Sequence, residues 1–154
     1  MPFCKKLNLD FLMKKLFVPF TILCFFISFK AFANGECGKL NVVIQNYTGV
    51  ACTLVKSQVQ SGYLTSKIPQ SIPPNQSSET ITFEQGYISG ISSIISYRCG
   101  SETVELFNNQ NHCLFKASQV KGHVYTPYSI HAKYIAQNGS WWSSYAGRIT
   151  WSLF

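Results

Sequence analysis

The chain has 154 residues, a formal net charge of +7 and 15% aromatic residues. Much of the positive charge lies near the N-terminus: residues 34–154 hold eight Lys or Arg and five Glu, so the net charge there is 8 − 5 = +3. These charges are spread along the chain, and the absence of a basic patch excludes a nucleic-acid-binding protein.

Residues 1–33 are predicted to be a secretory signal peptide. Lys14 and Lys15 precede an apolar run from Leu16 to Phe29, and Ala31-Phe32-Ala33 supplies a small-x-small cleavage site. Met13 is an alternative start. A retained anchor is the other interpretation, but the run is shorter than the roughly 20 residues that a membrane span needs. Cleavage leaves 34–154 as a single domain that is secreted or periplasmic.

Four cysteines follow the predicted cleavage site: Cys37, Cys52, Cys99 and Cys113. An even number in an exported chain predicts two disulfides, with the connectivity left open. A metal site is disfavoured because no close pair such as C-x2-C is present. Cys52, Cys99 and Cys113 all fall on the apolar side of their expected strands, so a cross-sheet bridge in the core is expected. A tight hairpin at Tyr47-Thr48 would place Cys52 opposite Val43, which argues against a Cys37–Cys52 bond.

Short strands rich in β-branched and aromatic residues, separated by Gly, Asn, Ser and Pro, are expected along the mature chain. We expect strands at 39–46, 50–57, 79–84, 91–99, 103–107, 112–117, 120–126, 129–136 and 148–153, with a short edge piece at 61–64. Ser93 falls on the apolar side of its strand, which is tolerable near a sheet edge.

Three segments are expected to be turns or loops. Residues 68–78 contain three prolines, which cannot donate to a sheet, so a loop is predicted. A turn is predicted at 108–111, and Asn138-Gly139 is a strong two-residue turn signal. Together these elements predict an all-β fold: an antiparallel β-sandwich of about eight or nine strands stapled by disulfides, with a small β-barrel as the alternative.

Catalytic and metal-binding motifs are absent from the sequence, so an enzyme is not expected, and neither is a cofactor. Glu102 and Glu105 are close in sequence but fall on opposite faces of a strand, which does not suit a two-carboxylate glycosidase. His123 and His131 could meet across a hairpin around Pro127, but two histidines alone make an incomplete metal site.

Aromatic residues are crowded into the last thirty positions, and all three tryptophans lie between Gly139 and Phe154. Trp151 alternates with Ile149 and Leu153, so it is assigned to the core. Trp141 and Trp142 are adjacent within a Ser/Gly segment, so they should point to opposite sides and expose one ring. Candidate ligand-binding residues are therefore Trp141, Trp142, Tyr145 and Tyr128, because amphipathic rings on loops suit sugars and lipid headgroup boundaries.

The N-terminal half also resembles aegerolysin-like β-sandwich proteins. The matching residues are Val43-Ile44-Gln45-Asn46-Tyr47-Thr48, Thr53-Leu54-Val55, Ser61-Gly62, Ile68-Pro69 and Ile72-Pro73-Pro74. Proteins of that family bind particular membrane lipids, and some form pores with a partner. The resemblance implies a sandwich and membrane-surface binding. The cysteines, the signal peptide and the C-terminal aromatic segment depart from that family.

The sequence thus predicts an exported, non-catalytic protein that binds a lipid, glycan or protein surface through an aromatic loop. A membrane-active toxin component is the first alternative, and a periplasmic enzyme inhibitor is the second.

Overall fold

A computed structural model describes residues 35–154 except 115–116 and 126–129. The predicted signal peptide and Tyr128 lie outside the described residues. Eleven strands are described, and three of them are only two residues long. Among these residues no helix is long and apolar enough to cross a membrane.

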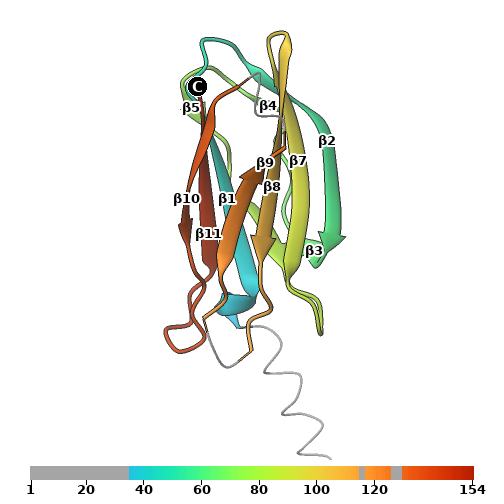
Figure 1. Cartoon of the computed structure of the whole chain (residues 1–154), viewed down its shortest axis with the longest axis vertical. Helices are drawn as coiled ribbons and strands as arrows, with labels where there is room; N and C mark the ends of the chain where they lie inside the picture. The colour runs from blue at the N-terminus through green and yellow to red at the C-terminus, as the bar shows by residue number, and fades with distance from the viewer. Residues whose placement is uncertain (1–34, 115–116, 126–129) are drawn as a thin grey trace, which may run out of the picture. The chain divides into compact units, whose positions relative to one another are not determined.

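Two facing sheets build the domain (Figure 1). Sheet A has the order β10-β11-β1-β6-β3. The short strand β5 pairs with the last two residues of β1, beyond the part of β1 that pairs with β6. Its strands are β1 (Lys39–Asn46), β3 (Tyr63–Leu64), β5 (Gln76–Ser77), β6 (Ile81–Glu84), β10 (Ala132–Gln137) and β11 (Gly147–Leu153). Every pairing is antiparallel except that of β1 with β11, which is parallel.

Sheet B has the order β4-β2-β7-β8-β9. Its strands are β2 (Cys52–Ser61), β4 (Ser71–Ile72), β7 (Ile91–Cys99), β8 (Glu102–Gln110) and β9 (Val120–Val124). A single 3-10 turn, η1 (Glu36–Gly38), precedes β1. Both sheets keep open edges, so the predicted sandwich is confirmed and the barrel alternative is wrong.

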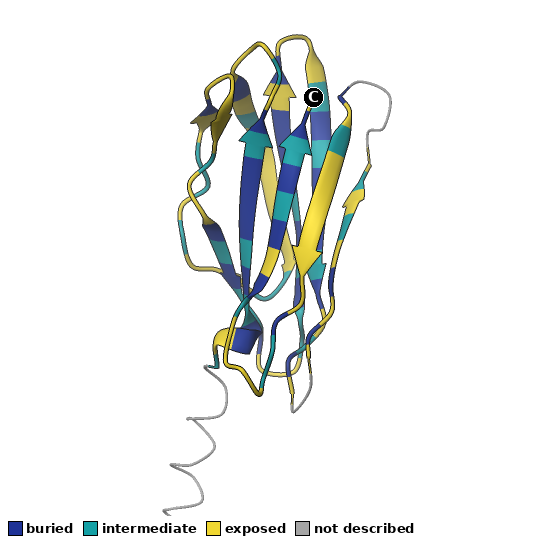
Figure 2. Cartoon of the chain, turned by 90° about the vertical axis from the view of Figure 1, so that its left-hand side faces the viewer, coloured by how far each residue is buried: buried dark blue, intermediate teal, exposed yellow. Residues whose placement is uncertain are grey.

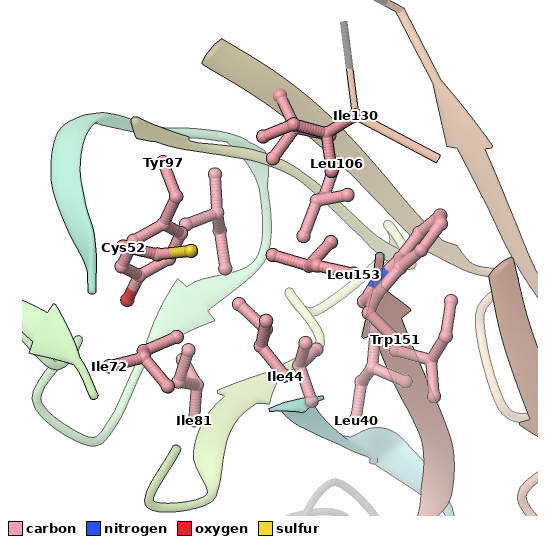
Figure 3. Packing of buried hydrophobic residues seen from close by; sticks show 14 of the residues in the cluster. Leu40, Ile44, Cys52, Ile72, Ile81, Tyr97, Leu106, Ile130, Trp151 and Leu153 are labelled. Atoms are coloured by element: carbon pink, nitrogen blue, oxygen red, sulfur yellow. The ribbon is translucent and has the colours of Figure 1, made fainter. Parts of the chain in front are cut away.

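The core lies between the sheets and follows the alternation of the strands (Figure 2). Along β11, Ile149, Trp151 and Leu153 are buried, as predicted, while Thr150 and Ser152 are partly exposed. β1 is central in sheet A, and Val42, Val43 and Ile44 are all buried there. The packed cluster includes Leu40, Ile44, Ile72, Ile81, Tyr97, Leu106, Ile130 and Trp151 (Figure 3).

Two disulfides are formed, Cys37–Cys113 and Cys52–Cys99. Cys52 and Cys99 lie directly opposite each other on β2 and β7, so this bond stays within sheet B, and the expected cross-sheet bridge is wrong. The expected hairpin at Tyr47-Thr48 is also wrong, because β1 belongs to sheet A and β2 to sheet B. Cys37–Cys113 instead connects η1, before β1, to the segment after β8.

Several predicted boundaries are corrected. The segment 108–111 is not a turn, because β8 continues to Gln110, and 112–114 is irregular rather than a strand. The loop predicted at 68–78 contains the two short edge strands β4 and β5. Ser93 is not near an edge: β7 lies in the middle of sheet B, and the buried Ser93 hydroxyl has no hydrogen-bond partner among the described residues.

Candidate surface-binding site

The two adjacent tryptophans lie in the loop 138–146, which connects β10 to β11. Ser140 and Tyr145 exchange two backbone hydrogen bonds of 3.0 and 3.3 Å, and these bonds close a tight turn over 141–144. Ser144 has a φ of 50° within this turn. The Ser140 hydroxyl oxygen also accepts a 3.1 Å hydrogen bond from the amide of Ser143. The turn is therefore ordered by its own backbone and projects from the end of the sandwich. We call residues 138–146 the Trp loop.

The two indoles of the Trp loop have different environments. Trp142 is 82% exposed, whereas Trp141 is only partly exposed. A Cβ atom built on Gly35 would lie 3.8 Å from Cζ3 of Trp141, so this second ring lies beside the start of the domain. The expectation that one ring is exposed is confirmed. Tyr145 is also exposed, and the fourth candidate, Tyr128, lies outside the described residues.

Asn138 and Gly139 anchor the base of the Trp loop instead of forming the predicted two-residue turn. Gly139 is buried and exchanges backbone hydrogen bonds of 3.1 and 3.2 Å with Ser118. The Asn138 side-chain oxygen accepts a 2.9 Å hydrogen bond from the amide of Val120. A Cβ at Gly139 would approach the Ser118 hydroxyl to 2.6 Å, so the close contact requires glycine.

A second apolar loop, 85–90, connects β6 to β7. Its tip carries Tyr87 and Ile88, which are 81% and 85% exposed. We call residues 85–90 the Tyr-Ile loop. This loop was not predicted from the sequence, because its two large apolar residues do not stand out in a segment of ordinary composition. Neither the Tyr-Ile loop nor the Trp loop contains a charged residue.

Both loops project from the same end of the sandwich, opposite the end that carries the C-terminus (Figure 1). The register explains their common position. Gly147 at the start of β11 pairs with Leu40 at the start of β1, and Glu84 at the end of β6 pairs with Lys39. Leu114 is a further exposed apolar side chain at this end, in the segment that follows β8. We call this end, with both loops and Leu114, the loop end.

The charged groups near the loop tips lie outside the two loops: Glu84 directly precedes the Tyr-Ile loop, and Arg148 is the second residue after the Trp loop. Lys39 donates to Glu36 at 2.6 Å, and this hydrogen bond raises the pKa of the lysine. Lys39–Glu36 is the single ion pair recorded among the described residues. The two loops themselves carry no charge, so transfer of their tips out of water requires no desolvation of a charge within them.

No metal centre emerges from the described part of the chain, where no group of three or more His, Cys, Asp or Glu residues could hold an ion. His123 lies on β9 in sheet B, and His131 directly precedes β10 in sheet A. The hairpin that would have paired them is therefore wrong.

The opposite end of the sandwich also exposes aromatic rings. Tyr47 and Phe154 stack on each other with ring centroids 5.5 Å apart and an interplanar angle of 16°. Each ring covers one face of the other, which distinguishes this pair from the highly exposed side chains of the loop end.

No family model and no curated protein matches the sequence. Among solved structures, the fold is similar to that of the lipid-binding protein Nakanori, with a TM-score of 0.56 and 14% identity over 92% of this chain and 83% of that chain. It is also similar to IP-1A from Alcaligenes faecalis, with a TM-score of 0.50 and 13% identity over 77% of this chain and 91% of that chain. The similarity to Nakanori confirms the predicted resemblance to aegerolysin-like β-sandwich proteins at the level of the fold.

Proposed function

We propose that this chain is an exported, non-catalytic protein that binds a lipid surface through the loop end. The observation that carries the proposal is the exposure of Trp142, Tyr87 and Ile88, each above 80%, on two uncharged loops at one end of the domain. Monomeric proteins seldom expose large apolar side chains together without a binding partner.

The physical chemistry of these side chains favours a lipid surface. Trp and Tyr are enriched where hydrocarbon meets water, because their rings are apolar and their N–H or O–H groups remain hydrated. Full burial of each large side chain contributes about 1.5–3 kcal/mol before ordering costs are subtracted. Three such groups together contribute about 4.5–9 kcal/mol before those costs, which corresponds to weak, reversible binding.

Export and the choice of a lipid have separate support. Two disulfides are typical of proteins that fold outside the cytosol, and the predicted signal peptide agrees with that origin. Lipid binding is supported by the fold shared with Nakanori and by the sequence resemblance to aegerolysin-like proteins. A glycan or protein ligand would use the same rings, so the experiment must separate these ligands.

Vesicle flotation tests the proposal. The disulfide-bonded protein is mixed with phosphatidylcholine vesicles, with and without sterol and anionic phospholipid. We expect Trp142→Ser and the pair Tyr87→Ser with Ile88→Ser each to weaken vesicle binding about tenfold or more. Ile135→Ser is the matched control, because Ile135 is 80% exposed but lies on strand β10. Unchanged binding in both loop variants, or binding that soluble glycans abolish, would contradict a lipid ligand.

A further inference from the structure

Gln85 connects the Tyr-Ile loop to the segment after β8. Its side-chain oxygen accepts a 2.8 Å hydrogen bond from the amide of Cys113, and its Nε2 donates to the Cys113 carbonyl at 3.3 Å. The backbone amide of Gln85 donates to the Gly38 carbonyl at 2.9 Å. One residue thus holds both backbone groups of Cys113 and is itself held by η1.

Only glycine fits at position 38, because the Gln85 side chain occupies the space that a Cβ atom would need. A Cβ at Gly38 would lie 2.9 Å from both Cδ and Nε2 of Gln85. Any larger residue would therefore displace the amide group that binds Cys113. The Gln85 amide group therefore packs directly against Gly38 while it binds Cys113.

The Cys37 carbonyl makes the corresponding connection to the Trp loop. It accepts hydrogen bonds from Nε2 of Gln110 at 2.7 Å and from the Ser118 hydroxyl at 3.4 Å. Ser118 in turn pairs with Gly139 at the base of the Trp loop. The Cys37–Cys113 disulfide joins these two sets of contacts, so a continuous path links the Tyr-Ile loop to the Trp loop.

Both sulfur-bearing residues of this path are shielded from solvent, since Cys37 and Cys113 are 1% and 2% exposed. Such a buried bond is a permanent structural link rather than a surface thiol pair open to exchange. The covalent part of the path is therefore protected from exchange in the folded domain.

We propose that Gln85 and the Cys37–Cys113 disulfide act as positioning groups that hold the Tyr-Ile loop and the Trp loop in one fixed arrangement. This inference rests on the proposed function. If the loops were free to move, inserting both of them into a lipid surface would require ordering them on binding, and that ordering would lower the affinity. Holding the loops in place beforehand removes this cost. Neither positioning group needs to contact the lipid.

The first test is Gln85→Ala, with Gln119→Ala as the control at an exposed glutamine of the same end. We expect Q85A to weaken vesicle binding about tenfold, because the Tyr-Ile loop loses its connection to Cys113. The same substitution should add no further loss to the Tyr87→Ser, Ile88→Ser variant, in which that loop no longer contributes. An equal loss in both backgrounds would overturn the positioning role.

The second test compares the two disulfides. Cys37→Ser with Cys113→Ser removes the bond at the loop end, and Cys52→Ser with Cys99→Ser removes a bond between β2 and β7 at the opposite end of β7. The bonds span 76 and 47 residues, so their removal should affect the unfolded chain similarly. We expect only the first pair to weaken vesicle binding. Equal losses would indicate general destabilisation and overturn the proposal.

Amide hydrogen exchange of the lipid-free protein gives a readout that does not depend on lipid. Both Q85A and the variant with Cys37→Ser and Cys113→Ser should raise exchange at the amide of position 113, and the disulfide variant should also raise exchange at Ser118 and Gly139, about tenfold in each case. Unchanged protection would overturn the inference. If the loop variants bind vesicles like the wild type while exchange rises as expected, the proposed function fails and the positioning role stands.

Discussion

The indole Nε1–H of Trp151 donates a 2.7 Å hydrogen bond to Oδ1 of Asn108 across the interior of the domain. Trp151 belongs to β11 in sheet A, and Asn108 belongs to β8 in sheet B. Both residues are completely buried. The bond satisfies two polar groups that would be costly to bury alone, and it specifies how the sheets face each other.

Loss of this bond should destabilise the domain. Asn108→Ala leaves a buried indole N–H without its acceptor, and we expect a loss of about 1–3 kcal/mol in the free energy of unfolding. Trp151→Phe leaves the Asn108 oxygen unpaired and also removes ring volume, so its cost should be at least as large. Urea unfolding of both single variants and the double variant measures these values. Fully additive losses would contradict a direct coupling of the two residues.

Gly122 on β9 is expected to be intolerant of any side chain. It lies beside Asn108 in the register of sheet B, and a Cβ there would come within 2.7 Å of both Ile149 Cδ1 and Trp151 Cζ2. Gly122→Ala should cost about 1–3 kcal/mol, because a packed core resists added volume. Gly49→Ala is the control, since nothing lies within 4 Å of its Cβ position. Thermal unfolding at matched concentrations compares the two, and equal melting temperatures would refute the close contact.

The strand pattern was predictable where alternation is strict, as in β11 and β6. Prediction of the strands failed where polar residues are buried with specific partners. Asn108 to Asn111 has the composition of a turn, but Asn108 meets Trp151 and Gln110 meets the Cys37 carbonyl, so β8 extends to Gln110. These partners are distant in sequence, and local propensity contains no information about them.

The candidate site was predicted only in part for the same reason. Adjacent tryptophans in a Ser/Gly segment indicated one exposed ring, and Trp142 is that ring. Tyr87 and Ile88 could not be associated with it, because their loop reaches the same end only through the pairing of β6 with β1. The connectivity of the disulfides was likewise left open, since four cysteines allow three pairings.

Asn46 organises the end of the sandwich that carries Tyr47, and its amide should not be replaceable by a carboxylate. Its Nδ2 donates to the carbonyls of Val50, Ile72 and Pro73 at 2.8, 3.0 and 3.1 Å, while its Oδ1 accepts from the amide and hydroxyl of Thr48. Asn46→Asp would direct a buried negative charge at three carbonyl oxygens.

We expect Asn46→Asp to cost about 3 kcal/mol or more in the free energy of unfolding at neutral pH. Asn75→Asp is the matched control, because Asn75 is exposed and its positive φ is tolerated by aspartate. Chemical unfolding with both variants measures the difference. Similar stabilities would show that the Asn46 amide contributes little.

Tyr97 should make the stability of the domain depend on pH in the alkaline range. Its side chain is fully buried, and its hydroxyl donates to the Pro69 carbonyl at 2.6 Å. Burial raises the pKa of this hydroxyl well above its ordinary value of 10.0. The unfolded chain therefore releases the Tyr97 proton near the ordinary pKa, while the folded protein retains it.

The sign follows from this difference in bound protons. The contribution of Tyr97 to the free energy of unfolding is fully present below the unfolded-state pKa of about 10. It is lost, by about 1.4 kcal/mol per pH unit, as the pH rises from that value toward the raised folded-state pKa. Urea unfolding from about pH 8.5 to about pH 11 should show this decline in the wild type. Tyr97→Phe has no proton to release at this position, so its stability should fall less steeply. Parallel curves for the two proteins would mean that Tyr97 ionises equally in both states.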